Sequence, residues 1–485
     1  MTPLREKQLQ SLKNEVFDIL VIGGGATGSG IALDAALRGY KTALVEAEDF
    51  GSGTSSKSTK LIHGGVRYLE DAVKHFNIKE FNLVQEALHE RTTILKIAPH
   101  IVEWLGIVVP VYSVWQKWYY GVGMKLYDLI SGSHTLNKSH FVSKEKVLEL
   151  FPHIKSEGLK GGIMYYDGQF NDSRLNLTLI LTSISHGASI ANYVSVIKLN
   201  KTDGRLSSAT VKDGFTGEEW EIKAKIIVNA TGPLTDKIRF LDDPEITPVV
   251  RASSGTHIIL DRKYSPKLTG LLIPKTSDGR VLFLLPWMGS TLAGTTDIAC
   301  ETLQDPKPSE KEIQFIIDHL NKYLDHPISK DEIKSSWCGI RPLVREAHVP
   351  GTSQLLRDYK IIVSSSKLYS IVGGKWTSYR KMACDLIDTI IKNGDLHKKG
   401  KCMTDQTVLV GGDRAKAIDA LAKEGFSNRL AEGYPFIEAE VIYAMRNEYA
   451  CTEMDILARR TRLYTLDQKA AEKALPRVRE LMQSK

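Results

Sequence analysis

The stretch that decides the fold lies near the start of the chain and reads VFDILVI over Val16–Ile22, GGGATGSG over Gly23–Gly30 and IALDAALR over Ile31–Arg38. The first part is a short apolar run typical of a buried strand, and the last part is typical of a helix. A second strand, Lys41–Glu46, closes a βαβ unit. Parallel strands joined by a helix imply a doubly wound α/β core.

Gly23, Gly25 and Gly28 have the spacing of the dinucleotide-binding fingerprint, after a strand and at the start of a helix. The first glycine permits the tight turn, the second lets the backbone approach a pyrophosphate, and the third allows close packing of helix on strand. Glu46 ends the second strand, where a carboxylate accepts hydrogen bonds from ribose hydroxyls. A glycine-rich turn without a ligand is the competing interpretation of the motif alone. The turn predicts nucleotide contacts at Gly23, Gly25, Ala26, Thr27, Gly28 and Glu46.

Three further segments favour FAD over a nicotinamide cofactor, which does not need them. A hydroxyl-rich segment follows the βαβ unit, a later strand ends in Ala-Thr-Gly, and a Gly-Gly pair precedes a helix. The first segment has the composition to wrap a second phosphate and the flavin. The predicted contacts are Thr54, Ser55, Ser56, Ser58, Thr59, Leu61, His63, Gly64 and Gly65, then Ala230, Thr231 and Gly232, then Gly373, Gly374, Lys375, Trp376 and Thr377.

The rest of the chain is predicted to interrupt this core rather than to follow it. Turn signals separate strands expected at 189–199, 207–212 and 220–223, and a further buried strand is expected at 225–231. A third core strand at 368–372 precedes a helix at 377–392. We predict an α/β fold in which a discontinuous Rossmann-like FAD-binding domain carries an inserted β-rich substrate (cap) domain and a C-terminal helical domain. The expected ranges are 16–95, 160–245 and 350–395 for the first, 96–159 and 246–349 for the second, and 403–485 for the third.

Composition excludes several classes of protein. The 485 residues are 42% hydrophobic and 25% charged, which is ordinary globular usage and rules out a mainly disordered chain. Lys plus Arg exceeds Asp plus Glu by 64 − 57 = 7 without a run of like charges, so no nucleic-acid partner is expected, whereas a phosphorylated substrate or an anionic membrane surface suits this balance. Five widely spaced cysteines without a Cys-x-x-Cys pair predict neither a metal site nor a disulfide framework. No apolar run is long enough to span a membrane, and the first residues resemble neither a secretory signal nor a transit peptide, so we expect none in this chain.

Several blocks of the sequence together resemble FAD-dependent glycerol-3-phosphate dehydrogenases, most of all the mitochondrial type. They are Asp18–Gly30, Ser58–Leu69, Tyr165–Gln169, Pro286–Trp287, Gly294–Asp297, Gly339–Leu343 and Gly373–Arg380. The resemblance implies oxidation of sn-glycerol 3-phosphate to dihydroxyacetone phosphate with electrons passed to ubiquinone, by a peripheral protein of the mitochondrial inner membrane. It leaves three partners to consider besides the substrate: the quinone, a membrane surface and a second copy of the chain in a homodimer. An oxidase that reduces oxygen and a flavin-binding protein without turnover are the alternatives.

Oxidation of a secondary alcohol on a flavin needs a base, a hydride path and an anchor for the phosphate. Forked guanidinium groups suit the anchor, and Arg67 and Arg341, each in a block that matches the family, are the first candidates. Tyr68 and Arg357 are further substrate contacts that the resemblance implies. A surface cation or a structural ion pair is the alternative role for any single arginine.

His257, on an apolar strand expected to face the flavin, is the candidate base, although a histidine packed in the core has the same pattern. His63 is the rival, but its segment favours a cofactor contact. Lys375 and Thr377, at the start of the last core helix, are predicted to touch substrate and to stabilise negative charge on the reduced flavin. The catalytic prediction is therefore His257, Arg341 and Lys375.

Aromatic residues concentrate between residues 101 and 130, with Lys117 and Lys125 among them. Trp and Tyr favour the headgroup level of a bilayer, and lysine side chains reach anionic lipid from there. A buried aromatic core of the cap domain explains the same composition. The aromatic residues are Trp104, Tyr112, Trp115, Trp118, Tyr119, Tyr120 and Tyr127.

Overall fold

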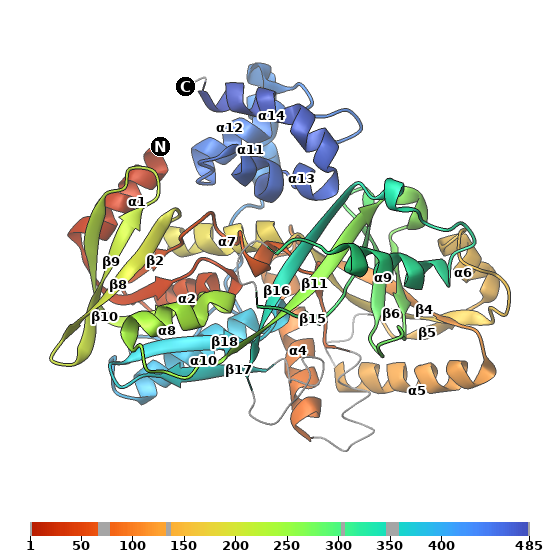
Figure 1. Ribbon diagram of the computed structural model, residues 1–485, viewed down its shortest axis with the longest axis horizontal. Coiled ribbons are helices and arrows are strands. Elements are labelled where there is room, and N and C mark those ends of the chain that lie inside the picture. The colour runs from red at the N-terminus through yellow and green to blue at the C-terminus, as the bar shows by residue number, and fades with distance from the viewer. Residues whose placement is uncertain (1, 66–77, 132–136, 302–305, 346–357, 484–485) are drawn as a thin grey trace.

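The computed structural model describes residues 2–65, 78–131, 137–301, 306–345 and 358–483. Two sheets lie side by side, and a group of helices formed by the last part of the chain packs above them (Figure 1). The first sheet has eight strands and the second has ten. The α/β fold with a C-terminal helical domain is as predicted.

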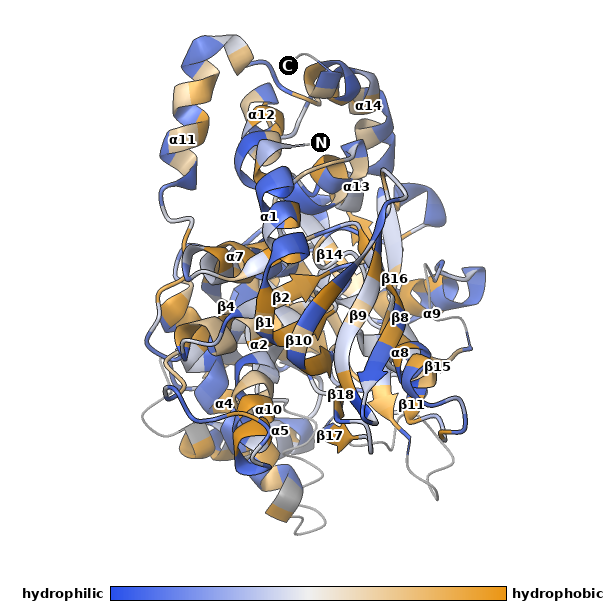
Figure 2. Cartoon of the chain, turned by 90° about the vertical axis from the view of Figure 1, so that its left-hand side faces the viewer, coloured by the Kyte–Doolittle hydropathy of each residue, from blue (hydrophilic) through white to orange (hydrophobic). Residues whose placement is uncertain are grey.

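The eight-stranded sheet is built around the βαβ unit. Its main path runs β17-β18-β10-β1-β2-β7, and β1 pairs in parallel with both β2 and β10. The strands β1 and β2 are coloured hydrophobic over most of their length in Figure 2, as expected of parallel strands covered on both faces. The strands are β1 (Val16–Ile22), β2 (Thr42–Val45), β7 (Ser189–Ala191), β8 (Val194–Thr202), β9 (Arg205–Asp213), β10 (Glu219–Asn229), β17 (Tyr359–Val363) and β18 (Leu368–Gly373).

Helices cover both faces of this sheet, as the alternation of side chains along β1 requires. Ile19 and Val21 pack into the core that contains α2 (Ala26–Leu37) and α10 (Tyr379–Lys392). Leu20 and Ile22 point to the opposite face, in the core that α1 (Pro3–Asn14) and α8 (Thr235–Asp242) cover. The helix α7 (Asp172–Ser185) packs beside α2.

Three details differ from the sequence-based expectation. The helix of the βαβ unit, α2, starts at Ala26 rather than Ile31, so the glycine turn runs directly into it. The strand expected at 189–199 is interrupted at Tyr193, which has φ 55° and separates β7 from β8. The two strands expected between Trp220 and Thr231 are one continuous strand, β10. Its first half pairs antiparallel with β9 and its second half pairs in parallel with β1, so a single extended strand serves both neighbours.

The ten-stranded sheet runs β15-β11-β14-β13-β12-β4-β6-β3, with β16 on β11 and β5 on β6. Two long antiparallel pairs dominate it, β4 with β6 and β11 with β16. Its strands are β3 (Leu61–Ile62), β4 (Val102–Val111), β5 (His140–Val142), β6 (Gly161–Phe170), β11 (Val250–Leu260), β12 (Thr269–Ile273), β13 (Leu282–Trp287), β14 (Ser290–Gly294), β15 (Ile298–Ala299) and β16 (Ser335–Val344). The accompanying helices are α4 (Ile78–Ile97), α5 (Val114–Ser131), α6 (Lys144–Leu150) and α9 (Glu310–Asn321).

The C-terminal helices are held to the first sheet by buried charges. Asp49, which follows β2, accepts hydrogen bonds from Arg460 at 2.7 and 2.9 Å and also pairs with Arg459. Burial raises the pKa of Asp49, but the charges of both arginines outweigh this effect and hold it at about 2. The helices are α11 (Arg414–Leu421), α12 (Glu438–Asn447), α13 (Leu463–Leu466) and α14 (Gln468–Gln483).

We expect Asp49→Asn to lower the free energy of unfolding at pH 7 by about 3–5 kcal/mol, because two buried guanidinium groups lose their shared carboxylate. The contribution of Asp49 exists above its unfolded pKa of about 3.9 and is lost as pH falls through the folded value of about 2. The difference in thermal midpoint between the two proteins should therefore shrink below about pH 4. Glu310→Gln, which removes an exposed pair with Lys330, is the control and should change the midpoint little. An equal shift of the thermal midpoint in both variants would contradict the role of Asp49 in holding the C-terminal helices.

Candidate active site

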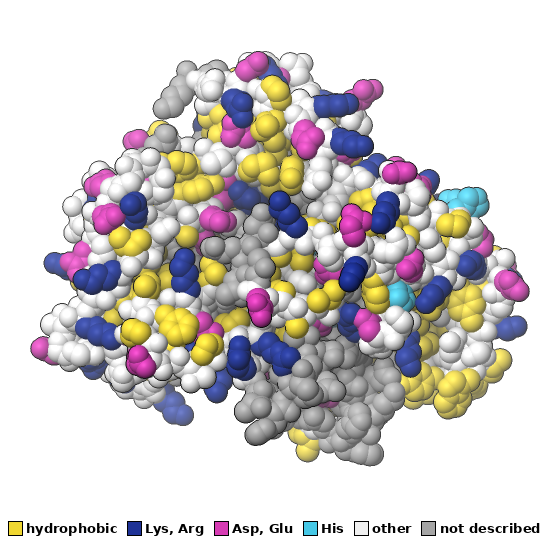
Figure 3. Space-filling view, in the orientation of Figure 1, with side chains coloured by type: hydrophobic (Ala, Val, Ile, Leu, Met, Phe, Trp, Pro, Cys, Tyr) yellow, Lys and Arg dark blue, Asp and Glu magenta, His cyan; other side chains and the backbone are white. Residues whose placement is uncertain are grey.

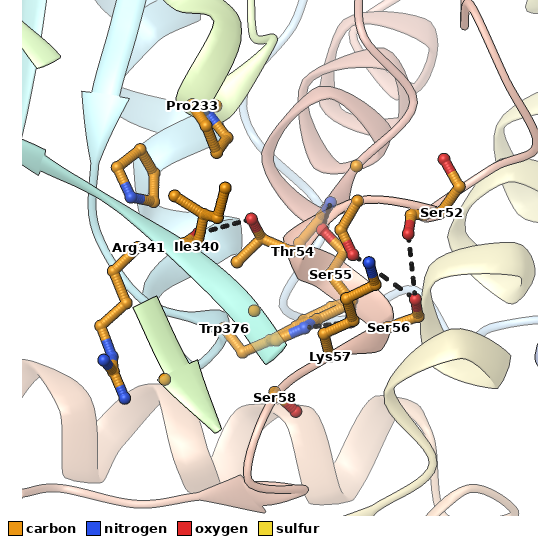
Figure 4. Close-up of a pocket in the computed structure, with 18 of the residues that line it drawn as sticks. Ser52, Thr54, Ser55, Ser56, Lys57, Ser58, Pro233, Ile340, Arg341 and Trp376 are labelled. Atoms are coloured by element: carbon orange, nitrogen blue, oxygen red, sulfur yellow. Dashed lines mark hydrogen bonds between the residues drawn. The ribbon is translucent and has the colours of Figure 1, made fainter. Parts of the chain in front are cut away.

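A cavity of about 1050 Å³ opens where the two sheets and the C-terminal helices meet. Its walls come from the glycine turn and segment 51–65, from the ends of β10 and β18, from β11 and β16, and from residues between Met454 and Gln468. Segments far apart in the chain therefore build one site. Figure 4 shows one part of its lining, with Thr54 and Ser55 near Ile340 and Trp376.

The glycine turn is packed as the fingerprint predicts. Gly23 has φ 106°, and a Cβ there would lie 2.7 Å from the carbonyl oxygen of Ala230. A Cβ on Gly28 would lie 1.9 Å from the carbonyl oxygen of Gly23, so no side chain fits between helix and strand. Gly25 lies at the cavity wall, where a bare backbone lets a phosphate approach the start of α2.

Glu46 lies at the cavity wall at the end of β2. Its Oε2 accepts a hydrogen bond from the Gly24 amide at 2.6 Å, and its Oε1 accepts one from the Glu48 amide at 3.0 Å. Burial raises the pKa of this carboxyl group. The two amides fix the carboxylate beside the glycine turn, as a ribose acceptor requires.

The hydroxyl-rich segment is held in place by partners from two other parts of the chain. It contains the 3₁₀ turn Thr54–Ser56. The Thr54 hydroxyl donates to the carbonyl of Ile340 at 2.6 Å, and the Trp376 indole donates to the carbonyl of Ser55 at 2.8 Å (Figure 4). The Thr377 hydroxyl bridges the amide and the carbonyl of His63 at 3.2 and 3.3 Å. These bonds tie the segment to the Gly373–Thr377 turn that we predicted to face the flavin.

Most predicted site residues line this one cavity. Gly28 and Gly64 lie behind its wall instead, and the amide of Gly64 donates to the Tyr127 hydroxyl at 3.0 Å. Arg67, Tyr68 and Arg357 lie outside the described residues. The predicted residues at the wall are Gly23, Gly25, Ala26, Thr27, Glu46, Thr54, Ser55, Ser56, Ser58, Thr59, Leu61, His63, Gly65, Ala230, Thr231, Gly232, His257, Arg341, Gly373, Gly374, Lys375, Trp376 and Thr377.

His257 stands on β11 with its ring stacked on Trp337 of β16, the centroids 5.3 Å apart and the planes inclined by 13°. Its Nε2 lies 2.9 Å from the Thr59 hydroxyl. Burial and then the charges of Lys60 and Arg341 lower its pKa well below 6.5. The imidazole is therefore neutral at pH 7 and can accept a proton.

Arg341 lies on β16, and its guanidinium group crosses the bare backbone of Gly255, where a Cβ would lie only 2.4 Å from Nη2. It donates to the carbonyls of Ser254 and Thr296 at 3.1 Å. Asp297 lies 3.7 Å from its Nη1. Because side chains alternate along a strand, Arg341 and Trp337 share a face of β16, and both line the cavity together with His257.

Lys375 follows β18 and precedes the 3₁₀ turn Trp376–Ser378, which leads into α10. Both preceding glycines have positive φ, 88° at Gly373 and 82° at Gly374. A Cβ at Gly373 would lie 2.3 Å from the carbonyl oxygen of Asp358. This tight turn places Lys375 and Thr377 at the cavity wall.

Sequence reasoning missed a buried charge cluster beneath the site. The ammonium group of Lys60 donates to Asp172 at 2.6 Å and lies over the rings of Trp287 and Trp337, 5.3 and 5.0 Å from their centroids. Arg462, from the C-terminal helices, lies 3.4 Å from the other oxygen of Asp172. Lys60 stands inside a block already quoted for the resemblance, but nothing local marks its distant partners. Thr295, Thr296 and Asp297, likewise in a quoted block, also line the cavity and were not predicted as site residues.

The residues present fit FAD. The cavity is lined by residues of both sheets and joins a phosphate cradle without side chains at Gly23 and Gly25, a fixed carboxylate at Glu46 and the turn at Lys375. Backbone amides and a cation suit a diphosphate and an electron-rich ring. FAD would be held by the glycine turn, Glu46, segment 54–65 and the Gly373–Thr377 turn.

Two family models match the chain. The model described as FAD dependent oxidoreductase matches residues 18–375, and the C-terminal domain of alpha-glycerophosphate oxidase matches residues 409–485. Among curated proteins, the probable mitochondrial glycerol-3-phosphate dehydrogenase of Caenorhabditis elegans is 46% identical over 521 residues, which is 99% of this chain and 72% of that protein. The mitochondrial glycerol-3-phosphate dehydrogenase of Homo sapiens is 46% identical over 525 residues, with the same coverage of both chains.

Two solved structures share the fold of this chain. The glycerol-3-phosphate dehydrogenase of Bacillus halodurans, complexed with FAD, superposes with a TM-score of 0.76 at 28% identity, covering 98% of this chain and 92% of that one. The L-alpha-glycerophosphate oxidase of Mycoplasma pneumoniae, at 16% identity and a TM-score of 0.60 over 80% of this chain and 98% of that one, shares the fold. The cofactor is FAD. With its cofactor site, both domains and its sequence in agreement, the chain belongs to the FAD-dependent glycerol-3-phosphate dehydrogenases.

Proposed function

We propose that this dehydrogenase oxidises sn-glycerol 3-phosphate to dihydroxyacetone phosphate with His257 as base and Arg341 as phosphate anchor, and that a quinone receives the electrons. One observation carries the proposal: a neutral imidazole and a guanidinium group line the same cavity as the FAD cradle, on two paired strands. The names of the relatives support the substrate.

Bound FAD would accept the hydride from C2 of the substrate. His257 takes the proton of the C2 hydroxyl at Nε2, the nitrogen beside the Thr59 hydroxyl. Trp337 holds the ring by stacking, so that the nitrogen keeps its direction into the cavity. The depressed pKa keeps this base ready at neutral pH.

Arg341 anchors the phosphate through its forked donors, which suit two phosphate oxygens. Arg67, Tyr68 and Arg357 remain predicted substrate contacts. Lys375 and Thr377 stabilise negative charge on the cofactor side of the cavity. Thr295, Thr296 and Asp297, which lie beside Arg341, and Trp337, which stacks on His257, also line the cavity.

We also infer peripheral attachment to the mitochondrial inner membrane through α5. Trp115, Trp118 and Val122 are 75%, 68% and 64% exposed, and Figure 3 shows hydrophobic side chains gathered at the lower right, over α5. By contrast, Tyr127 of the same helix is buried, so the aromatic segment divides between a core face and a surface face. Amphipathic helices of this kind lie in the plane of a membrane interface. Among the described residues no helix is both long and apolar enough to cross a bilayer.

The test of function is an anaerobic titration of the FAD-loaded protein with sn-glycerol 3-phosphate. One equivalent of substrate per flavin should bleach the flavin absorption, whereas glycerol should not bleach it. Subsequent addition of a quinone analogue should restore the absorption without peroxide. Peroxide formed at a similar rate in air would favour the oxidase, and an unbleached flavin would favour a protein without turnover.

Arg341→Lys should raise the substrate concentration that gives half-maximal bleaching about 10- to 100-fold, because a forked, charge-assisted contact to phosphate is lost. The FAD content should not change. Arg429→Lys, at an exposed position away from the cavity, is the control and should bind as the wild type does. Loss of FAD from the Arg341 variant would show that this residue serves the cofactor instead.

His257→Gln should lower kcat by about 10²–10⁴, the usual contribution of a positioned base, while FAD stays bound. In the wild type, protonation removes the base as pH falls through its depressed pKa. The value of kcat/KM should therefore stay level from pH 8 to 6.5 and decline only below that range. His63→Gln is the matched control, and a larger loss of kcat there would make His63 the base.

The serine triple variant of Trp115, Trp118 and Tyr119 should bind anionic liposomes at least about tenfold more weakly, because aromatic side chains at the interface are lost. A second triple variant, with serine at Phe215, Leu268 and Val408, removes equally exposed apolar side chains elsewhere and is the control. Sedimentation with vesicles measures both, after circular dichroism has shown that both are folded. Unchanged binding of the first variant would refute the role of α5.

A further inference from the structure

Two cysteines and a carboxyl group meet on the side of α2 that faces α10, away from the catalytic cavity. Cys384 stands on α10, Cys402 follows that helix, and Asp34 stands near the end of α2. Their Sγ and carboxylate oxygen atoms all lie within 4.8 Å of one another. Asp34 is buried, whereas both cysteines are partly exposed. None of the three lines the cavity or takes part in the proposed reaction.

The surroundings of this cluster argue against a metal ion. The Arg38 guanidinium donates to the sulfur of Cys384 at 3.4 Å, and the Arg380 guanidinium donates to the sulfur of Cys402 at 3.8 Å. A divalent cation would have to sit beside both positive groups, which repel it. A thiolate, in contrast, is stabilised by such neighbours.

The two sulfurs differ in their readiness to ionise. Hydrogen bonds from the Cys384 thiol and then from Thr404, whose hydroxyl lies 3.1 Å from the sulfur, lower the pKa of Cys402 against the effect of burial. The same contact raises the pKa of Cys384. Burial raises the pKa of Asp34 to about 7, so this carboxyl group can hold a proton next to the pair. By contrast, burial raises the pKa of Cys300, Cys338 and Cys451.

We propose that Cys384 and Cys402 form a reversible disulfide when the protein meets a hydroperoxide. The observation that carries this proposal is a pair of partly exposed sulfurs within 4.8 Å of each other, each of which accepts a hydrogen bond from a guanidinium group.

In the first step the Cys402 thiolate attacks the peroxide. A sulfur–oxygen bond forms, the oxygen–oxygen bond breaks, and the leaving oxygen takes a proton and departs as water when the oxidant is hydrogen peroxide. In the second step the sulfur of Cys384 attacks that of Cys402. The sulfur–sulfur bond forms, the sulfur–oxygen bond breaks, and the hydroxide leaves as water with the thiol proton of Cys384. Two thiols lose two electrons and two protons, and a dithiol reductant reverses the change.

The disulfide would close a loop over residues 385–401 and tie the middle of α10 to the segment that leads into the C-terminal helices. The sulfurs must approach from within 4.8 Å to the bonded distance of about 2 Å, a movement that side-chain rotation supplies. The start of α10 follows directly on the Lys375–Thr377 turn of the active site. The bond would therefore restrain the middle of the helix that begins at this turn.

The test treats the reduced, FAD-loaded full chain with hydrogen peroxide at pH 6.5, blocks the remaining thiols with an alkylating reagent and digests it for mass spectrometry. We expect a linked peptide that joins Cys384 to Cys402, lighter by two hydrogens than the two thiol peptides together, and its loss after dithiothreitol. In the untreated protein, alkylation of Cys402 at pH 6 should be at least about tenfold faster than alkylation of Cys451. The thermal midpoint of the oxidised protein should rise by a few degrees.

Cys384→Ser and Cys402→Ser distinguish the cysteine that attacks the peroxide from the cysteine that then completes the disulfide. Without Cys384, peroxide should leave a sulfenic acid on Cys402 that dimedone captures, whereas without Cys402 the remaining Cys384 should stay reduced. Cys451→Ser is the control and should form the linked peptide as the wild type does. The proposal is overturned if treated wild type holds no link between residues 384 and 402, or if the reduced protein binds one equivalent of Zn²⁺ that both serine variants lose. All of these readouts are independent of catalytic turnover.

Discussion

The active site depends on one ion cluster, in which Asp172 of α7 holds Lys60 on one side and Arg462 on the other. All three side chains are buried, and buried charges are tolerated only when they are paired and hydrogen-bonded. Asp172 therefore fixes the distance between the cofactor segment, the first sheet and the C-terminal helices. Lys60 extends the cluster into the second sheet by lying over Trp337, which in turn stacks on His257.

This arrangement explains how His257, the proposed base, can stay neutral inside a site rich in positive charge. Burial removes His257 from water, and Lys60 and Arg341 add repulsion against a second proton. Arg341 itself is balanced by Asp297 and by backbone carbonyls. In the proposed reaction, an incoming phosphate would meet a cation already oriented for it, and an incoming alcohol would meet a neutral imidazole beside the Thr59 hydroxyl.

The parts of the fold that could be predicted are those with a local cause. The glycine turn and the Gly373-Gly374 turn could be predicted because backbone approach and positive φ restrict the residue type. Glu46 could be predicted because it ends the second strand of the βαβ unit. His257 and Arg341 needed the family resemblance, since a histidine or arginine on an apolar strand has several explanations. The partners of Lys60 could not be predicted, because Asp172 and Arg462 are joined to it only by the packing of distant elements. The continuity of β10 escaped prediction for a similar reason: its two halves have different neighbours but one backbone.

The position of Arg462 and Gln468 in the wall of the cavity has a consequence for biosynthesis. The glycine turn is synthesised long before Arg462 and Gln468, because it precedes them in the chain. A nascent chain that ends before Arg462 therefore exposes an FAD site with one side missing, and Asp172 then has Lys60 but not Arg462 as an ion-pair partner. Stable loading of the cofactor should follow the docking of the helices around Arg462 and Gln468, so flavin retention reports that this part of the wall is in place.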